Sequence, residues 1–338
     1  MKDSSVVNVK MRTVKPLLVV ILVVGCVFWV GYSSRRAATG RSGARTFEPT
    51  AARLQRGRYI VEGPAHCFEC HSEIDWENPG GQPKPGKKGG GKNFADYGLP
   101  WLTAPNITPD AETGAGTWTD GQVARAIREG IGHDGRRLFP VMPYEHFRAM
   151  SDEDLASVVV YLRSIDPVQN ALPQTIIPDV MKQTLPPHQP IAEPISPPNT
   201  SDRVAHGEYL VALASCSSCH TPMKHGVHVS ELAFAGGMSF KGPWGEVSSA
   251  NITPDPSGIS YYDEALFIKT MRTGHVGGRP LKSIMPWGYF RNMTDEDLKA
   301  IFAFLRTLPS VQHRVDNTEP PTTCPVCRGK HGYGDMNH

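Results

Sequence analysis

Apolar residues recur at helical spacing in three segments, and the same three segments occur twice along the chain. The last segment of each set carries the clearest stripe, formed by Leu155, Val158, Val159 and Leu162 and again by Leu298, Ile301, Phe302 and Leu305. Both stripes follow a pattern typical of a helix N-terminus, Ser151-x-x-Asp154 in the first set and Thr294-x-x-Asp297 in the second. Alternation typical of strands is nearly absent, so the pattern predicts an all-α class.

Two weaker helical segments precede the stripe in each set. The opening helix is predicted to bury one face, made of Leu54, Gly57 and Val61 and, in the second set, of Val204, Gly207 and Val211. The middle helix is predicted to begin at Thr119, with Gln122 three residues later, and at Ser260, with Asp263 three residues later. Each set is therefore predicted to fold as three helices joined by loops.

A different apolar run lies near the N-terminus. Residues 17–32 read LLVVILVVGCVFWVGY, which approaches the ~17–20 residues that a membrane span requires. We predict an uncleaved transmembrane signal-anchor over residues 17–34; a cleaved signal peptide and lipid attachment at Cys26 are the alternatives. Four basic residues flank the run on each side, so the positive-inside rule gives no orientation.

Five short motifs recur in the same order, which indicates a duplicated domain. They are Gly-x-Tyr at 57 and 207, Cys-x-x-Cys-His at 67 and 216, Asn-Ile-Thr-Pro-Asp at 106 and 251, Met-Pro-aromatic at 142 and 285, and (Ser/Thr)-Asp-Glu-Asp-Leu at 151 and 294. The stretch between the copies holds nine prolines and is predicted to be a semi-rigid, extended linker. The predicted division is 1–16 N-terminal segment, 17–34 anchor, 35–50 juxtamembrane segment, 51–166 first repeat, 167–200 linker, 201–310 second repeat and 311–338 C-terminal tail.

Composition narrows the class of protein. The 338 residues are 39% hydrophobic and 20% charged, with 30 prolines and 33 glycines, which favours small, loop-rich domains that need something besides apolar burial to hold them. The net charge of +2 gives no support for nucleic-acid binding. The segment GGQPKPGKKGGGK at 80–92 is interpreted as a basic surface loop, either simply solvated or a docking patch for an acidic partner.

The cysteines carry the candidate chemistry. Cys67-x-x-Cys70-His71 and Cys216-x-x-Cys219-His220 match the attachment signature of c-type haem, in which both thiols form thioethers and the histidine binds the iron. A zinc site would need four ligands that converge on one metal, whereas each of these pairs sits in its own repeat with its own histidine. Structural disulfides would not require the histidine twice.

The iron of such a group needs a ligand on its other face. Met142 and Met285 each precede proline and an aromatic residue, and proline excludes the residue before it from helical conformation. A thioether on such a loop is suited to close the second face of the haem, so both are predicted ligands. Flexible core packing is the alternative role of these methionines. His133 and His275 rank second as ligands.

Together these motifs resemble class I cytochrome c domains, and most resemble the cytochrome subunits of membrane-bound alcohol, gluconate and aldehyde dehydrogenases. The resemblance implies two covalently bound haem c groups and an electron carrier that is not itself an enzyme. Its partners would be a periplasmic dehydrogenase as donor and the quinone pool, an oxidase or another cytochrome as acceptor. It also implies an anchor in the bacterial inner membrane, residues 1–16 in the cytoplasm and both haem domains in the periplasm. Those subunits usually carry three haem domains, whereas this chain has two and a short tail.

Several other residues receive predicted roles. By the same resemblance, Asn106 and Asn251 lie beside the haem, where they would reach a propionate or a buried backbone group; a simple turn role is the alternative. Four aromatic residues are predicted to pack the first helix against the last: Tyr59, Tyr161, Tyr209 and Phe304. In the tail, Cys324 and Cys327 lack an adjacent histidine, so metal binding, a disulfide and a redox-active pair all stay open.

Two other functions fit two c-type haems. A di-haem cytochrome c peroxidase is the main alternative, and a structural or sensory cytochrome is a third. A peroxidase needs one iron whose sixth position can open for peroxide beside an acid–base group, and therefore an asymmetry between the domains. Because both copies carry a Met-Pro pair, the sequence favours the electron carrier.

Overall fold

The structure is a computed structural model, and it describes residues 45–315 apart from four single positions (184, 225, 244 and 278), together with 322–323 and 330–331. The predicted anchor at 17–34, with Cys26, and the tail pair Cys324 and Cys327 lie outside the described residues. Within the described part of the chain, no helix combines the length and the apolar character needed to cross a membrane.

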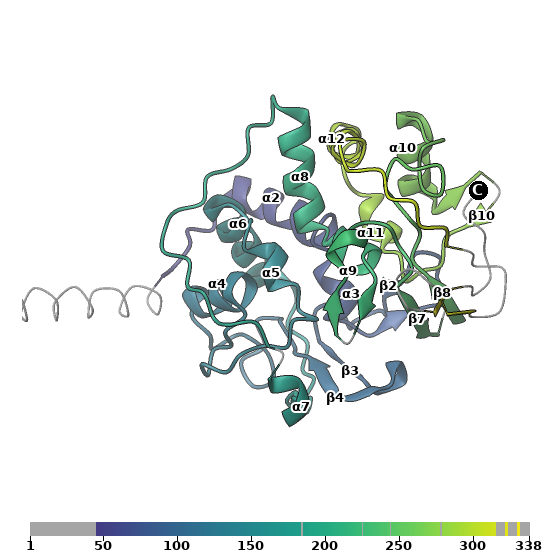
Figure 1. Ribbon diagram of the computed structural model, residues 1–338. Coiled ribbons are helices and arrows are strands. Elements are labelled where there is room, and N and C mark those ends of the chain that lie inside the picture. Colours follow the sequence, from purple (N-terminus) through teal and green to yellow (C-terminus); the bar gives the residue numbers. More distant parts are fainter. Residues whose placement is uncertain are drawn as a thin grey trace, which may run out of the picture. The chain divides into compact units, whose positions relative to one another are not determined.

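Two sets of helices follow one another in the same order, as the duplicated motifs predict (Figure 1). The first set comprises α2 (Ala51–Glu62), α3 (Cys67–Cys70), α4 (Asp120–Glu129), α5 (Tyr144–Phe147) and α6 (Asp152–Ser164). The second comprises α8 (Arg203–Leu213), α9 (Cys216–His220), α10 (Glu264–Thr273), α11 (Trp287–Phe290) and α12 (Asp295–Leu305). Two short 3₁₀ helices lie in the loops, Ala95–Tyr97 and Ser230–Leu232.

The first and last helices of each repeat cross with their backbones in contact, and a glycine makes this possible. A Cβ atom added at Gly57 would lie 1.9 Å from the Ser157 carbonyl oxygen, and one added at Gly207 would lie 1.9 Å from the Ala300 carbonyl oxygen. The repeated Gly-x-Tyr motif therefore begins with the residue that sets the closest helix approach in each repeat.

Replacing Gly57 or Gly207 with alanine is expected to lower the free energy of unfolding by about 3 kcal/mol, because the helices must separate to admit the methyl group. Urea denaturation followed by circular dichroism measures this change. Gly86→Ala is the control: its φ is +71° but its Cβ would meet no atom within 4 Å, so only a smaller backbone strain is expected. Equal losses for Gly57→Ala and Gly86→Ala would refute the close-approach explanation.

Helix starts agree with the predicted caps at three of four positions. Thr119 forms a complete capping box with Gln122, and Ser151 and Thr294 accept hydrogen bonds from the backbone N–H three residues later. The prediction of Ser260 as a cap was wrong: α10 begins after Asp263, whose carboxylate accepts from the Leu266 N–H at 2.7 Å. A carboxylate at this position satisfies an orphan donor and favours the positive end of the helix dipole.

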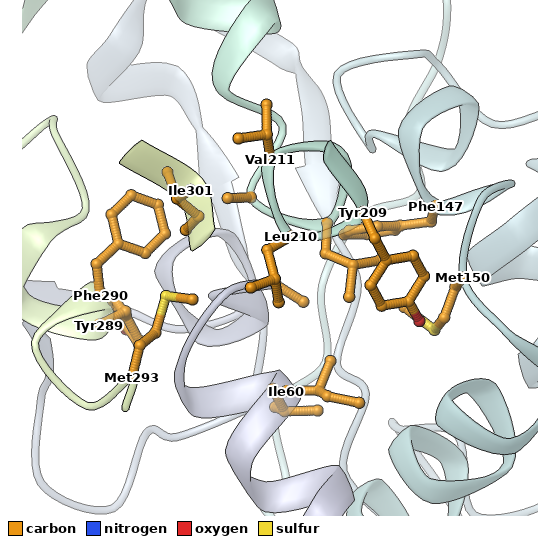
Figure 2. Close-up of a cluster of buried hydrophobic side chains, with 14 of the residues drawn as sticks. Ile60, Phe147, Met150, Tyr209, Leu210, Val211, Tyr289, Phe290, Met293 and Ile301 are labelled. Atoms are coloured by element: carbon orange, nitrogen blue, oxygen red, sulfur yellow. The ribbon is translucent and has the colours of Figure 1, made fainter. Parts of the chain in front are cut away.

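The predicted stripes of α6 and α12 are buried throughout, whereas the buried faces of the opening helices were only partly predicted. Val204 is 39% exposed, and Ile60 and Leu210 instead occupy the centre of the core with no exposed surface. Figure 2 shows Ile60 and Leu210 in one cluster, between side chains of the first repeat and side chains of the second. The two repeats therefore share one hydrophobic core.

The all-α prediction holds for the core but missed short strands in the loops. Each ladder is antiparallel and joins two strands that are neighbours in the sequence. The pairs are β1 (Ile74–Asp75) with β2 (Gln82–Pro83), β3 (Lys92–Phe94) with β4 (Leu99–Ala104), β5 (Met223–Lys224) with β6 (Val227–His228), β7 (Ser239–Gly242) with β8 (Gly245–Ser248), β9 (His275–Val276) with β10 (Arg279–Pro280), and β11 (Thr322–Thr323) with β12 (Lys330–His331). Most are two residues long, which is too short to produce a visible alternation of side chains.

The glycine-rich segment 80–92 is only in part the surface loop that its composition predicted, because residues 84–86 are exposed whereas 89–92 are buried; its docking role stays a prediction. It contains β2, and Gly90 and Gly91 pack against side chains of the linker. The Gly91 N–H donates to the His71 carbonyl at 2.9 Å, and the Gly236 N–H does the same for His220 at 2.8 Å. Its lysines are paired within the repeat, Lys84 and Lys87 with Glu73 and Lys88 with Glu62. The segment therefore packs against the first Cys-x-x-Cys-His turn.

The proline-rich linker is extended, as predicted, apart from the short helix α7 (Asp179–Lys182). It is not a free spacer, because it is hydrogen-bonded along the first repeat. The Thr175 hydroxyl donates to the Thr103 carbonyl at 3.0 Å, and the Ile176 N–H donates to the Trp101 carbonyl at 3.0 Å. Proline lacks the backbone donor that regular structure needs, which leaves the segment extended while the other residues supply these contacts.

Candidate functional site

Both Cys-x-x-Cys-His motifs form a single helical turn that starts from a strained residue. His66 precedes Cys67 with φ of 34°, and Ser215 precedes Cys216 with φ of 50°. Non-glycine residues rarely adopt this left-handed conformation, and such strain concentrates at functional sites. Sequence reasoning missed this conformation, because the two copies carry different residues, His66 and Ser215, at the position.

The two histidines that end these turns are oriented alike. The Nδ1 atom of His71 lies 2.8 Å from the Pro105 carbonyl oxygen, and that of His220 lies 2.7 Å from the Ala250 carbonyl oxygen. A carbonyl oxygen only accepts hydrogen bonds, so Nδ1 carries the proton and Nε2 keeps its lone pair. This arrangement is typical of histidines that bind a metal through Nε2.

Burial sets the protonation of the site. It lowers the pKa of both His71 and His220, which favours the neutral imidazole that a metal requires. It raises the pKa of the Cys67 thiol to about 12 and that of Cys70 to about 11. In the second repeat, burial raises the pKa of Cys216 and of Cys219 to about 12.

These surroundings favour uncharged sulfur, the state of a thioether, over the thiolate that zinc binds. No disulfide joins these four cysteines. Across the described residues, no group of three or more His, Cys, Asp or Glu side chains converges as a metal-binding cluster. Thioether attachment of haem therefore fits the geometry better than a zinc site or structural disulfides.

An apolar cavity in the first repeat brings the predicted site residues together. Cys67, Cys70 and His71 line it, and so does Met142. Its other walls are mainly apolar side chains from α4, α6 and the loops, among them Ile127, Val159, Leu162, Phe139 and Trp118. Thr175 and Ile177 of the linker also line the cavity. A flat apolar macrocycle fits such walls, with a nitrogen and a sulfur ligand available from the same cavity.

The two Met-Pro loops have the same local conformation. Met142 N–H donates to the Phe139 carbonyl at 3.1 Å, and Met285 N–H donates to the Lys282 carbonyl at 3.0 Å. Each methionine directly precedes the proline that caps α5 or α11. Met285 is half-buried against the hydrophobic core that the two repeats share. As ligand of the second site it stays a prediction, supported by this equivalence.

The rival histidines are engaged elsewhere. His133 stacks on Trp118 with ring centroids 4.2 Å apart and an interplanar angle of 19°. His275 is exposed, and its Nδ1 lies 2.9 Å from the carbonyl oxygen of Thr273. Their second rank as ligands is consistent with these contacts.

The repeated asparagines bind backbone, which was one of three predicted roles. Asn106 Oδ1 accepts from the Thr108 N–H at 3.0 Å, while its Nδ2 donates to the Val168 carbonyl at 2.6 Å. Asn251 makes the equivalent bonds to Thr253 and Val311, at 2.9 Å each. Each asparagine directly follows the residue whose carbonyl orients the histidine. The motif therefore fixes the loop that holds the His71 or His220 ring.

Replacing Asn106 with alanine is expected to lower the free energy of unfolding by about 2–3 kcal/mol, because buried donors and acceptors lose their partner. Asn199→Ala is the control, since Asn199 caps an exposed turn. There the free energy of unfolding is expected to fall by only a few tenths of a kcal/mol. Urea denaturation compares the two variants. Equal stability of Asn106→Ala and the unchanged protein would contradict the assigned role.

The aromatic residues on the first and last helices divide into two groups. Tyr161 packs these helices together as predicted, because its hydroxyl donates to the Glu62 carboxylate in the same repeat. For Tyr59 and Tyr209 the prediction was wrong: their hydroxyls bind the last helix of the other repeat. Sequence periodicity assigns a residue to a helix face but does not show which repeat that face meets.

Comparisons with known proteins all identify the same family. The cytochrome c family model matches residues 54–166 and 204–309. The chain is 29% identical over 306 residues to the alcohol dehydrogenase (quinone) cytochrome c subunit of Gluconacetobacter polyoxogenes, covering 84% of this chain and 62% of that protein. It is 31% identical over 286 residues to the fructose dehydrogenase cytochrome subunit of Gluconobacter japonicus, covering 79% and 56%.

A diheme cytochrome c-type protein of Cereibacter sphaeroides is 27% identical over 261 residues, covering 73% of this chain and 83% of that protein. Against the dehydrogenase subunits named above, by contrast, the chain spans somewhat more than half of the relative's length. The family model matches both repeats, and each match contains one Cys-x-x-Cys-His turn and one Met-Pro loop. The chain therefore belongs to the cytochrome c family, with two cytochrome c domains in tandem.

Proposed function

We propose that this protein is a non-catalytic electron carrier that holds two covalently bound haem c groups. Cys67, Cys70 and His71 would hold one, and Cys216, Cys219 and His220 the other. Met142 and Met285 would supply the second axial ligands. The observation that carries the proposal is the matched geometry of both histidines, each of which ends a Cys-x-x-Cys turn and is oriented through Nδ1 by a backbone carbonyl.

The residues present fit this role. When bound, haem c supplies a reversible one-electron couple at its iron. The histidines would present Nε2 to the iron, and a methionine on the other side raises the reduction potential. The mainly apolar cavity walls of the first repeat would limit the access of water to the iron, which also favours the less charged, reduced state. The chain's part is thus binding, orientation and tuning of the potential.

The partners and the location belong to the same proposal. Two of the relatives are named as cytochrome subunits of alcohol and fructose dehydrogenases, which supports a dehydrogenase as electron donor. The acceptor would be the quinone pool, an oxidase or another cytochrome of the respiratory chain. The apolar run at 17–34 supports a single-pass anchor in the bacterial inner membrane, with both haem domains in the periplasm.

A di-haem peroxidase is not favoured. Such an enzyme needs one iron with an open position, whereas the two Met-Pro loops have the same local hydrogen bonds. Two of the named relatives are cytochrome subunits, and the third is a diheme cytochrome c-type protein.

An anaerobic reductive titration of the purified protein tests the proposal. We expect two one-electron equivalents per chain, a low-spin ferric spectrum at both sites and no turnover of hydrogen peroxide. A high-spin ferric signal at one site, together with peroxide turnover, would favour the peroxidase. A protein without covalent haem would refute both functions.

A further inference from the structure

A tyrosine of the second repeat inserts into the N-terminal turn of the last helix of the first. The Tyr209 hydroxyl, on α8, accepts a hydrogen bond from the Ser151 backbone N–H at 3.1 Å and donates one to Asp154 Oδ2 at 2.6 Å. Ser151 is the N-cap of α6, and Asp154 is its third residue. One hydroxyl from another repeat therefore links the cap and the first turn of this helix.

The reverse contact is also present. The Tyr59 hydroxyl, on α2 of the first repeat, accepts from the Thr294 backbone N–H at 3.0 Å and donates to Asp297 Oδ2. Thr294 is the N-cap of α12 and Asp297 its third residue. The two contacts are thus reciprocal, each made by the tyrosine of a Gly-x-Tyr motif to the Asp-Glu-Asp-Leu helix of the other repeat.

The chemistry of helix caps explains why a tyrosine fits there. In a capping box, a Glu or Gln at the third position reaches back to the N–H of the cap residue, and Gln122 does this for Thr119 at 2.8 Å. In α6 and α12 that position holds aspartate, whose side chain is one methylene shorter than glutamate. The hydroxyl of the other repeat bridges the gap, so that each capping box is completed by the partner repeat.

The carboxylates at these contacts have further hydrogen-bond partners. Arg56 donates to both oxygens of Asp154 at 2.8 Å, and His206 Nε2 lies 2.7 Å from Asp297 Oδ1. Asp154 is only 6% exposed. Burial and the bond to Asp297 raise the pKa of Tyr59 to about 12, so its hydroxyl remains a donor over the physiological range. Hydrogen bonds to a charged group at a buried site are the stronger kind.

Other contacts between the repeats involve the haem-attachment turns themselves. Ser218, inside the second Cys-x-x-Cys turn, has its Oγ 2.7 Å from His146 Nε2 on α5 of the first repeat. His66, just before the first Cys-x-x-Cys turn, meets the ring of Phe290 on α11 edge to face, with centroids 5.5 Å apart. α5 and α11 directly follow the Met-Pro loops. The attachment turn of each repeat therefore lies against the helix that follows the methionine loop of the other.

We propose that Tyr59 and Tyr209 are positioning residues, a reciprocal pair of latches that hold the two haem-attachment turns in one fixed arrangement for electron exchange between the two sites. This inference rests on the proposed function, because it needs two redox centres. It concerns the arrangement of the centres and assigns neither tyrosine a place in the haem sites.

The double variant Tyr59→Phe/Tyr209→Phe removes both hydroxyls and little else. We expect the ratio of latched to separated arrangements to fall by on the order of a hundredfold, because each hydrogen bond to a charged group contributes roughly a factor of ten or more. Pulsed electron paramagnetic resonance on the ferric protein measures the distribution of inter-haem distances. Flash photolysis measures the rate of electron exchange between the haems. We expect one narrow distribution in the unchanged protein, and a broadened distribution with slower exchange in the variant.

Tyr161→Phe is the matched control, since it removes a half-buried hydroxyl whose bond to Glu62 stays within the first repeat. The second repeat carries Phe304 at the corresponding place, so the variant should fold. It should leave the distance distribution and the exchange rate unchanged. Thermal unfolding adds a readout independent of haem: the unchanged protein and Tyr161→Phe should unfold in one transition, and the double variant in two.

A double variant with two haems, an unchanged distance distribution and an unchanged exchange rate would overturn the inference, even if its melting temperature fell. If the double variant does not fold, the single variants Tyr59→Phe and Tyr209→Phe replace it. Each should broaden the distribution, and no change in either would again overturn the proposal. A haem count other than two would instead refute the proposed function, in which case the number of unfolding transitions still decides whether the latches exist.

Discussion

Replacing Met142 with leucine is expected to lower the reduction potential of one haem and leave the other unchanged. Leucine keeps the volume of the side chain but removes the sulfur, so the iron would lose the proposed ligand that stabilises its reduced form. We expect a decrease on the order of 200 mV, part of the roughly 0.8 V over which axial ligands set haem potentials. A spectroelectrochemical titration measures both potentials, and the ferric spectrum should show one high-spin haem.

Met181→Leu is the control for this variant. Met181 lies in the short linker helix α7 and does not line the cavity, so the same substitution there should change neither potential. Met285→Leu should act on the other haem alone, which assigns the two potentials to the two repeats. Unchanged potentials in Met142→Leu would show that the first iron takes a different ligand, and His133 would then be the residue to test.

Removing one pair of attachment cysteines is expected to have the largest effect on stability. In Cys67→Ala/Cys70→Ala the first haem would lose its proposed covalent attachment, and the apolar cavity of that repeat would lose the group proposed to fill it. The loss is expected to be comparable with the roughly 5–15 kcal/mol that stabilises a whole domain, so the first repeat should not fold stably. Haem content should fall by half, as measured by a pyridine haemochrome assay on the denatured protein.

The corresponding pair variant, Cys216→Ala/Cys219→Ala, serves as the comparison. It should also lose half of the haem, and the remaining potential should differ from the one that Cys67→Ala/Cys70→Ala retains. Full haem content in either pair variant would mean that the altered motif does not attach haem. Full stability with half the haem would mean that the cavity walls hold the repeat together without it.

The sequence predicted the features that depend on local pattern. The apolar stripes of α6 and α12 are buried, and the caps at Thr119, Ser151 and Thr294 are formed. The predictions of stripes and caps succeeded because helical periodicity and capping involve residues only a few positions apart. The predicted site residues of the first repeat line one cavity, and their binding of haem stays a prediction.

The features that were missed depend on contacts distant in sequence. The Tyr209 hydroxyl is 55 residues from the carboxylate that it binds, and the Tyr59 hydroxyl is 238 residues from its partner. The attachment of the linker to the first repeat has the same character, because Asn170 binds a carbonyl of the glycine-rich segment, and Thr175 and Ile176 bind carbonyls of β4. The left-handed residue before each Cys-x-x-Cys turn was missed for another reason: it is fixed by the turn and not by its own side chain.

The central claim is that each Cys-x-x-Cys-His motif carries its own covalently attached haem. Mass spectrometry of the protein after denaturation in acid, extraction with acetone and proteolytic digestion tests it most directly. We expect the peptide with Cys67 and Cys70 and the peptide with Cys216 and Cys219 each to be heavier by the mass of one haem. Both peptides at the mass of the unmodified polypeptide, with the pigment in the acetone phase, would contradict the account.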